Sequence, residues 1–333
     1  MVLLGEIIVK ILFIGGSGNI SLSSSLLLLN QGHELWLLNR SGHCAELVGA
    51  HYIQADINDA AQLKSKLQGH EWDVVVNWIA FTKTDVARDV ALFTAKTKQY
   101  VFISSASCYQ NPGPSPIITE QTPLANPLWQ YSRDKITAEE YLLAAYEQAD
   151  FPVTIVRPSH TYARVIPITI GGWTEYTAVA RMKAGKPIVV QGDGYALWTL
   201  THADDFAVGF CGLLGNPLTT GEDYHITSDK FLSWNEIYQQ TAAAVGVEAK
   251  IVHVTSDKIC ALNSDYIGTL LGDKSVSAIF DNTKIKAIVP EFNPKITYAE
   301  GIQRVIAWFE EDKARQIINP KTDAFIDLLI ANA

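Results

Sequence analysis

The sequence predicts an α/β protein built on a doubly wound parallel sheet, and three observations lead to that prediction. Short aliphatic runs alternate with helix-length segments through the first half of the chain. The runs are apolar on both faces, as in DVVVNWIA over residues 73–80, which is typical of parallel strands covered by helices on both sides. A glycine-rich turn over residues 15–18 joins the first strand to the first helix.

The two kinds of segment follow one another in a regular order. Strands are expected over residues 8–14, 35–39, 51–54, 73–80, 100–104 and 153–157. Helices are expected between them over residues 19–31, 60–68, 85–98 and 131–148. Because crossovers between parallel strands are right-handed, this order places helices on both faces of one sheet.

The alternation loosens after about residue 158, where glycine and proline become frequent and helical segments dominate. We therefore expect a sheet domain over residues 1–158. A smaller, mostly helical C-terminal lobe, interleaved with the end of the sheet, is expected over residues 159–333. Asp204 and Asp205 precede a helical run and are interpreted as capping groups, so no metal site is expected.

Composition narrows the class of protein. The chain has 333 residues, of which 48% are hydrophobic and 18% charged, which suits a compact globular protein with a large core. A formal net charge of −9 argues against a nucleic-acid surface. Residues 11–32 carry no charge but contain too many glycines and serines for a membrane span. The 4 cysteines are far apart and form no metal-binding motif, which favours a reducing, cytoplasmic compartment.

The glycine-rich turn has the composition of a nucleotide-binding turn. Gly15 allows a tight turn directly after the first strand. Gly18 lacks the side chain that would keep a pyrophosphate away from the backbone N–H groups at the start of the helix. Ser21 stands where a third small residue packs the helix on the strand. The turn therefore predicts a bound dinucleotide, against the alternative of an ordinary surface turn.

The end of the second strand indicates which dinucleotide is bound. An acidic residue there accepts hydrogen bonds from the ribose 2′-hydroxyl of NAD, whereas an arginine pairs with a 2′-phosphate. This chain has Asn39-Arg40-Ser41 and no acid. NADP(H) is therefore favoured over NAD(H), with Arg40 as the phosphate-binding group; a solvated surface arginine is the alternative. Asp56 follows the third strand and is placed to meet the adenine.

Three residues suited to proton transfer follow the fifth strand. Ser105 lies at the end of this strand, and Tyr131 and Lys135 lie four residues apart on the next helix, so they share one helix face. An ammonium group near a phenol is expected to lower its pKa, which ordinarily lies near 10, and so to make Tyr131 a general acid or base. The Ser105 hydroxyl can hold a substrate oxygen on which charge develops.

Motifs continue along most of the chain. They are GGSGNIS at 15–21, ISSASCY at 103–109, YSRDK at 131–135, IVRP at 155–158, GDG at 192–194, HADD at 202–205 and FDNTK at 280–284. Together they resemble the extended short-chain dehydrogenase/reductase family, also called the NAD-dependent epimerase/dehydratase family. The resemblance implies a Rossmann-type fold with bound NAD(P) over residues 1–158, a substrate-binding lobe after it, and a homodimer through the helices near residues 85–98 and 131–148.

The resemblance also implies roles for individual residues. Ser105 would orient the substrate oxygen, Tyr131 would transfer the proton, and Lys135 would hold the nicotinamide ribose and lower the tyrosine pKa. The predicted cofactor contacts are Gly15, Gly18, Asn19, Ile20, Asn39, Arg40, Asp56, Ile57, Ala80, Lys135 and Pro158. The predicted substrate contacts are Ser107, Trp129, His160 and Trp198.

Two departures from the family pattern narrow the activity. Sugar dehydratases of the family carry an acidic pair after the catalytic serine or threonine, and this chain has Ala106-Ser107 there, which argues against dehydration. Nucleotide-sugar epimerases usually carry an arginine a few residues past the Gly-Asp-Gly motif. Trp198 occupies that position here, and an aromatic ring cannot neutralise a diphosphate.

These observations favour an NAD(P)-dependent oxidoreductase that reduces a carbonyl, or oxidises an alcohol, on a small organic molecule. A sugar or nucleotide-sugar epimerase is the first alternative, although it lacks a recognisable diphosphate-binding group. A non-catalytic, cofactor-binding regulatory protein is the second. The complete set of Ser105, Tyr131 and Lys135 argues against it, because a binding protein needs no tuned phenol. No nucleic-acid or membrane partner is expected.

Overall fold

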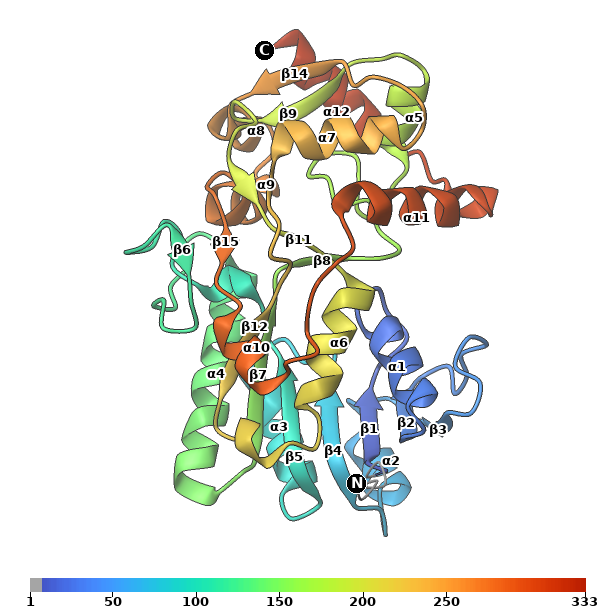
Figure 1. Cartoon of the computed structure of the whole chain (residues 1–333), viewed down its shortest axis with the longest axis vertical. Coiled ribbons are helices and arrows are strands. Elements are labelled where there is room, and N and C mark those ends of the chain that lie inside the picture. The colour runs from blue at the N-terminus through green and yellow to red at the C-terminus, as the bar shows by residue number, and fades with distance from the viewer. Residues whose placement is uncertain (1–7) are drawn as a thin grey trace.

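A seven-stranded, wholly parallel sheet forms the centre of the larger part of the molecule. The computed structural model describes residues 8–333, and the strand order in the sheet is β12-β7-β5-β4-β1-β2-β3 (Figure 1). The strands are β1 (Lys10–Ile14), β2 (Glu34–Asn39), β3 (His51–Gln54), β4 (Trp72–Asn77), β5 (Thr97–Ile103), β7 (Val153–Pro158) and β12 (Asp223–Ile226). The predicted doubly wound parallel sheet is confirmed.

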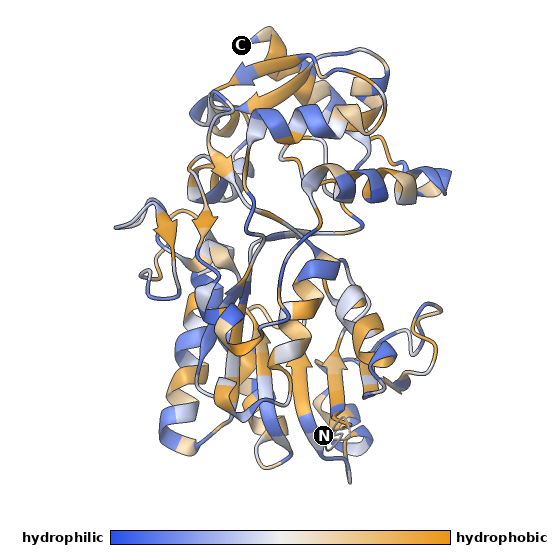
Figure 2. Ribbon diagram, in the orientation of Figure 1, coloured by the Kyte–Doolittle hydropathy of each residue, from blue (hydrophilic) through white to orange (hydrophobic). Residues whose placement is uncertain are grey.

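Helices cover both faces of this sheet. The covering helices on one face are α1 (Ser21–Asn30), α6 (Ala203–Leu213) and α10 (Thr283–Ile288), and on the other α2 (Ala60–Lys66), α3 (Lys83–Phe93) and α4 (Gln130–Ala149). Successive strand side chains point to opposite faces, so Phe13 packs in the first layer and Leu12 in the second. Both layers are apolar, as the hydrophobic colour of the central strands shows (Figure 2). This explains why the strand sequences read as unbroken aliphatic runs.

Several element boundaries differ from the prediction, and the largest differences are at the ends of β4 and α3. Strand β4 ends at Asn77 instead of continuing to Ala80, because the Asn77 Oδ1 atom accepts a hydrogen bond from the Ile79 backbone N–H at 2.9 Å and turns the chain. Helix α3 ends at Phe93, and Ala95 has a φ of 59°, in the left-handed region. As a result Lys98 lies in strand β5 rather than in the preceding helix.

The rest of the chain forms a lobe above the carboxyl ends of the sheet strands (Figure 1). Its helices are α5 (Thr177–Lys183), α7 (Trp234–Ala243), α8 (Ser256–Leu262), α9 (Tyr266–Thr269), a π-helix (Leu270–Lys274), α11 (Tyr298–Glu310) and α12 (Pro320–Ala331). Its short paired strands are β8 (His160–Tyr162) with β11 (Leu200–His202), β9 (Ile188–Gln191) with β14 (Ile251–Val254), and β10 (Leu197–Trp198) with β13 (Leu232–Ser233). A further pair, β6 (Ile117–Ile118) with β15 (Ile279–Phe280), lies beside the sheet.

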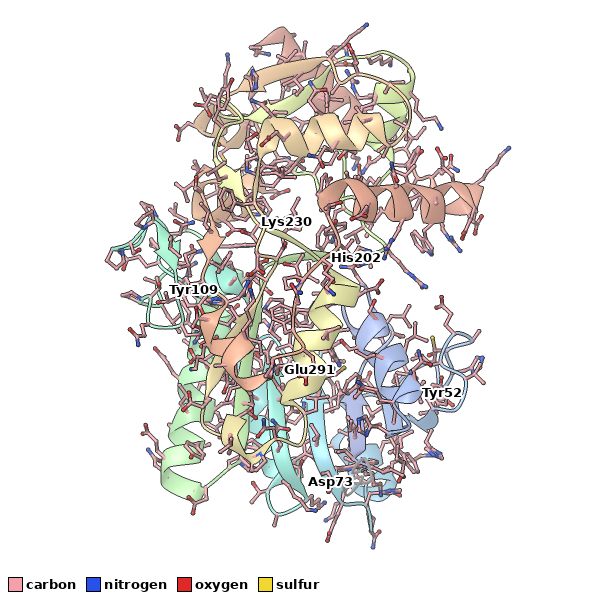
Figure 3. The ribbon with its side chains drawn as sticks, in the orientation of Figure 1. Tyr52, Asp73, Tyr109, His202, Lys230 and Glu291 are labelled. Carbon is pink, nitrogen blue, oxygen red and sulfur yellow. The ribbon has the colours of Figure 1, made fainter. Side chains whose placement is uncertain are left out.

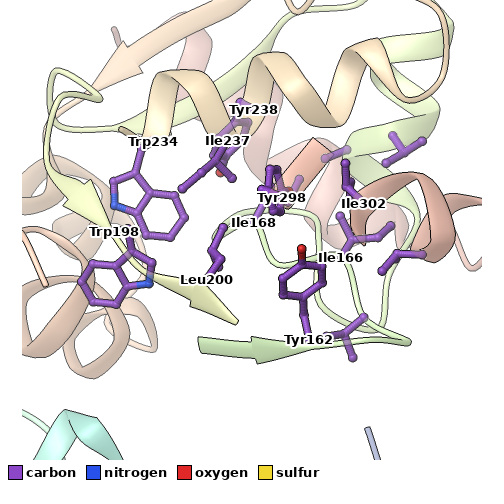
Figure 4. Close-up of a cluster of buried hydrophobic side chains, with 14 of the residues drawn as sticks. Tyr162, Ile166, Ile168, Trp198, Leu200, Trp234, Ile237, Tyr238, Tyr298 and Ile302 are labelled. Carbon is purple, nitrogen blue, oxygen red and sulfur yellow. The ribbon is translucent and has the colours of Figure 1, made fainter. Parts of the chain in front are cut away.

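The chain crosses between the two parts more than once. After β11 it re-enters the larger part, where α6 packs against α1 and β12 pairs with β7 at the edge of the sheet. The lobe has its own core, in which Trp198 and Trp234 lie side by side with ring centroids 5.5 Å apart (Figure 4). Within residues 8–333, none of the helices combines the length and the apolar character needed to span a bilayer.

Candidate active site

One large cavity joins the sheet to the lobe. Its volume is about 1000 Å³, and it opens at the carboxyl ends of β1, β4, β5 and β7, the edge where parallel α/β sheets bind ligands. The predicted site residues that line it are Gly15, Gly18, Asn19, Ile20, Ser105, Ser107, Trp129, Tyr131, Lys135, Pro158, His160 and Trp198. Tertiary folding thus brings the glycine turn, the three residues predicted to transfer a proton and the four predicted substrate contacts to one cavity.

The glycine turn leaves its backbone open toward this cavity. Gly15 and Gly16 have φ angles of 94° and 97°, which side chains rarely tolerate. A Cβ atom on Gly16 would lie 2.6 Å from Leu37 Cδ2, whereas one on Gly18 would meet nothing closer than 3.6 Å. The space beside Gly18 is therefore free for a ligand, and the turn fits the pyrophosphate of a dinucleotide at the start of α1.

Ser21 and Asn19 have structural roles that the sequence did not reveal. The Gly18 N–H donates a hydrogen bond to Ser21 Oγ at 2.9 Å, which closes the turn. The Asn19 side chain donates to the Thr161 carbonyl at 3.0 Å and accepts from the Ala163 N–H at 2.9 Å, so it ties the turn to the lobe. Only the backbone of Asn19 remains available for the predicted cofactor contact.

The residues predicted to meet the adenosine end lie outside the described lining of the cavity. Ile57 is buried in the core, and Asp56 accepts a hydrogen bond from the Asn58 N–H at 2.9 Å, as a turn residue does. Arg40 is exposed. The Asn39 Nδ2 atom, at the end of β2, is buried and has no hydrogen-bond partner among the described residues, which suits a ribose hydroxyl. The contacts at this end remain predictions.

Lys135 is held by two backbone carbonyls, one in the loop after β4 and one at the end of β5. Its Nζ atom donates to the Ala80 carbonyl at 2.6 Å and to the Ile103 carbonyl at 2.7 Å. It also lies 4.6 Å from the centre of the Phe81 ring. Burial lowers the pKa of Lys135 to about 8. Ala80 therefore contributes its carbonyl to the site, while its own side chain is buried.

Tyr131 is a neutral phenol in this site. Burial raises the pKa of Tyr131 to about 12, although a hydrogen bond from Ser105 acts in the lowering direction. The expected lowering by Lys135 is not found: its ammonium lies 5.8 Å from the centre of the Tyr131 ring and is not among the causes of the shift. At neutral pH the phenol keeps its proton, so Tyr131 is arranged to donate one.

Aromatic side chains form the walls beyond these residues. Trp129 packs against Tyr131 with ring centroids 5.1 Å apart. Trp173 lies 5.3 Å from His160, and burial lowers the pKa of His160 well below its usual value, so this imidazole is neutral. Trp198 is only 4% exposed and belongs both to the lobe core and to the cavity wall.

The sequence did not predict the contribution of residues 263–274. Lys274 lines the cavity, forms an ion pair with Asp273 at 2.8 Å, and lies 5.5 Å from the centre of the Trp198 ring. It therefore places a positive charge beside the position where the family arginine is missing. No local pattern could have identified Lys274, because its position depends on how the lobe folds back over the sheet.

A buried charge network holds α4 against the sheet. Arg157 on β7 pairs with Glu139, one turn beyond Lys135 on α4, and with Asp223 on β12, each at 2.5 Å. It also donates to the Tyr109 hydroxyl at 3.0 Å. Figure 3 shows Tyr109 on the loop after β5. The network joins α4 to two sheet strands and so fixes the helix that carries Tyr131.

Comparison with known proteins identifies a matching family model and several similar proteins. The model of the NAD-dependent epimerase/dehydratase family matches residues 90–227. A 2'-dehydrokanamycin reductase from Streptomyces kanamyceticus is 26% identical over 239 residues, which cover 71% of this chain and 67% of that protein. The chloroplast stem-loop binding protein of 41 kDa b from Arabidopsis thaliana is 27% identical over 259 residues, which cover 73% of this chain and 65% of that protein. The chain thus spans about two thirds of the length of these relatives.

Solved structures share the fold over nearly the whole chain. A dTDP-glucose 4,6-dehydratase from Bacillus anthracis in complex with NAD superposes with a TM-score of 0.72 at 22% identity, covering 92% of this chain and 98% of that one. A UDP-glucuronic acid 4-epimerase from Bacillus cereus in complex with NAD gives 0.71 at 18% identity, covering 91% and 96%. The chain is thus similar to the NAD-dependent epimerase/dehydratase family over residues 90–227, and it shares its fold with two enzymes whose structures were solved with NAD.

Proposed function

We propose that this chain is an NAD(P)-dependent reductase that converts a carbonyl group on a small organic molecule to an alcohol. The observation that carries the proposal is the meeting of Tyr131, Ser105 and Lys135 with the glycine turn in one cavity. Since burial raises the pKa of Tyr131 to about 12, the phenol carries at neutral pH the proton that the product alcohol needs.

The residues of the site have separate tasks in this reaction. The bound nicotinamide supplies the hydride. Ser105 donates a hydrogen bond to the carbonyl oxygen and stabilises the charge that develops there. Tyr131 gives its proton to the same oxygen. The Lys135 ammonium, fixed by the Ala80 and Ile103 carbonyls, is placed to hold the nicotinamide ribose.

Reduction fits the site better than dehydration does. Ala106 and Ser107 provide neither the acid nor the base that water loss needs. The similarity to a protein named as a reductase supports the same choice. Epimerisation of a sugar is the second candidate, because Lys274 beside Trp198 supplies a cation in the lobe. Both candidates use the same proton donor and differ in whether the cofactor is consumed.

The purified protein, incubated with NADPH and a panel of aldehydes, ketones and keto sugars, tests the proposal. We expect loss of the absorbance of reduced nicotinamide with at least one carbonyl. Interconversion of sugar epimers without net loss of that absorbance would favour the second candidate. Neither reaction, with NADPH bound, would indicate a cofactor-binding protein instead.

NADP(H) is the proposed cofactor, with Arg40 as the group that pairs with the 2′-phosphate. Its exposure at the end of β2, with no acidic residue before it, supports this choice. Arg40→Ala is expected to weaken NADPH binding about tenfold or more and NADH binding little, since only NADPH carries the charge that Arg40 would meet. Quenching of tryptophan fluorescence measures both affinities without a substrate. Equal weakening of both would overturn the preference.

Two finer expectations also remain proposals. A homodimer through the outer faces of α3 and α4 is expected, and sedimentation at two concentrations tests it. The cytoplasmic location rests on the scattered cysteines alone, three of which are buried in the fold: Cys108, Cys211 and Cys260.

A further inference from the structure

Four polar side chains form a hydrogen-bonded chain that ends at the catalytic serine. The Asn126 Nδ2 atom lies 3.3 Å from Ser132 Oγ, which lies 2.7 Å from Ser107 Oγ. Ser107 Oγ in turn lies 2.9 Å from Ser105 Oγ. Asn126 and Ser132 are buried, and Ser107 is at the edge of the cavity. The chain therefore runs from the protein interior to the reacting centre.

The orientation of the Asn126 amide is settled by its backbone neighbours. Its Oδ1 atom accepts from the N–H groups of Leu128 at 3.2 Å and Trp129 at 3.0 Å. Its Nδ2 atom donates to the carbonyl oxygens of Ser107 at 3.0 Å and Gly272 at 2.7 Å. A flipped amide would face two carbonyls with its oxygen and two N–H groups with its nitrogen. The nitrogen is therefore the atom that meets the hydroxyl chain.

This orientation sets the direction of every hydroxyl in the chain. An amide nitrogen cannot accept a hydrogen bond, so Ser132 cannot donate to Asn126. Within the described part of the chain, Ser107 Oγ is then the acceptor within reach of the buried Ser132 hydroxyl. Because the Ser132 proton occupies the line between those two oxygens, Ser105 Oγ is the remaining described acceptor within hydrogen-bond distance of the Ser107 proton. This arrangement pairs both hydroxyl protons, whereas a Ser107 proton turned into the cavity would have no hydrogen-bond partner among the described residues.

Both lone pairs of Ser105 Oγ consequently accept hydrogen bonds within the protein, and its proton remains available to a ligand. Its Oγ atom receives the Ser107 hydroxyl and also the Ser107 backbone N–H, at 3.2 Å. Two accepted bonds occupy both lone pairs, so the single Ser105 proton can only point away, toward Tyr131 and the cavity. Each donor in a chain polarises the next, so Ser105 becomes a stronger donor than an isolated serine.

We propose that Asn126 and Ser132 are positioning residues that make Ser105 a hydrogen-bond donor toward the reacting oxygen. The inference rests on the proposed reductase function only for its consequence on rate. Gly272 belongs to the lobe, so Asn126 makes its full set of hydrogen bonds only when residues 270–274 pack over the site. Asn126 and Ser132 would thus act on the reaction through Ser105, although neither belongs to the Ser-Tyr-Lys set.

Neutron diffraction from crystals of the deuterated protein tests the direction without any substrate. We expect the Ser132 deuteron on the line to Ser107, the Ser107 deuteron on the line to Ser105, and the Ser105 deuteron toward Tyr131. A Ser107 deuteron directed at Ser132, or a Ser105 deuteron directed at Ser107, would overturn the proposal.

Kinetics with a carbonyl that the enzyme reduces test the consequence. Ser132→Ala removes one link and is expected to lower kcat about two- to tenfold while the KM for NADPH stays unchanged. Asn126→Asp places an acceptor at the start of the chain, which reverses the hydroxyls and takes the Ser105 proton away from the substrate. A loss of kcat on the order of a hundredfold is expected, the usual effect of losing one donor to the reacting oxygen.

Thr137→Ala is the matched control, because it removes an exposed hydroxyl from the same helix that takes no part in the hydrogen bonds between Asn126 and Ser105. It is expected to retain the wild-type rate. Equal kcat for Ser132→Ala, Thr137→Ala and the wild type would overturn the inferred role. If the wild type reduces no carbonyl, the reductase proposal fails, and the neutron map still decides whether Ser105 is held as a donor.

Discussion

The two sides of the cavity differ in how their polar groups are held. On the sheet side, Lys135 is fixed by two carbonyls and Ser105 by the backbone and hydroxyl of Ser107. On the lobe side, both ring nitrogens of His160 are without a hydrogen-bond partner among the described residues, and aromatic rings such as Trp173 make the wall. We infer that the sheet side sets the reaction and that the lobe side sets the substrate. Changes on the first side should affect every substrate, and changes on the second should affect some more than others.

Replacement of the proton donor is the strongest test of the sheet side. Tyr131→Phe is expected to lower kcat about a thousandfold with every carbonyl substrate, within the range that general acid catalysis contributes. The affinity for NADPH should stay unchanged. Tyr141→Phe removes a hydroxyl from the same helix away from the cavity and should retain full activity. A Tyr131→Phe enzyme with wild-type rates would assign the proton to another group.

The pH dependence of reduction distinguishes Lys135 from Tyr131. Lys135 has a pKa lowered to about 8, and its positive charge is lost as the pH rises through that value. Tyr131 has a pKa of about 12, so it remains protonated at pH values where Lys135 has already lost its charge. We therefore expect kcat/KM for reduction to be level below about pH 8 and then to fall about tenfold per pH unit. A profile that stays level to the point of unfolding would show that the Lys135 charge is not needed.

A substitution on the lobe side should give a smaller and selective effect. Trp173 is 48% exposed and lines the cavity, so its loss removes aromatic contact area with little cost to the core. Trp173→Ala is expected to raise KM about fivefold for ring-shaped substrates, from the loss of one stacking contact, and less for short aldehydes. The kcat of the Trp173→Ala variant is expected to stay unchanged. Tyr195→Ala, 71% exposed and outside the described cavity lining, is the control. A uniform effect on all substrates would contradict the division between the two sides.

The sequence by itself was enough to predict the central sheet and to propose the residues of the reaction. Strand and helix periods are local properties, so the order of aliphatic runs was enough to predict the doubly wound fold. The four-residue spacing of Tyr131 and Lys135 places them on one helix face whatever surrounds the helix. Gly15 and Gly18 likewise predict a nucleotide-binding turn from their spacing within a single turn.

Only the tertiary structure decided the properties that depend on distant neighbours. Burial, rather than the nearby Lys135, sets the direction of the Tyr131 pKa shift. The side chain of Asn19 is hydrogen-bonded to a lobe segment far along the sequence, and Lys274 lines the cavity from the π-helix of the lobe. Asn126 acquires its role from Ser132 and from the Gly272 carbonyl. Desolvation and long-range hydrogen bonds arise only when separate segments pack together, and no local spacing in the sequence records them.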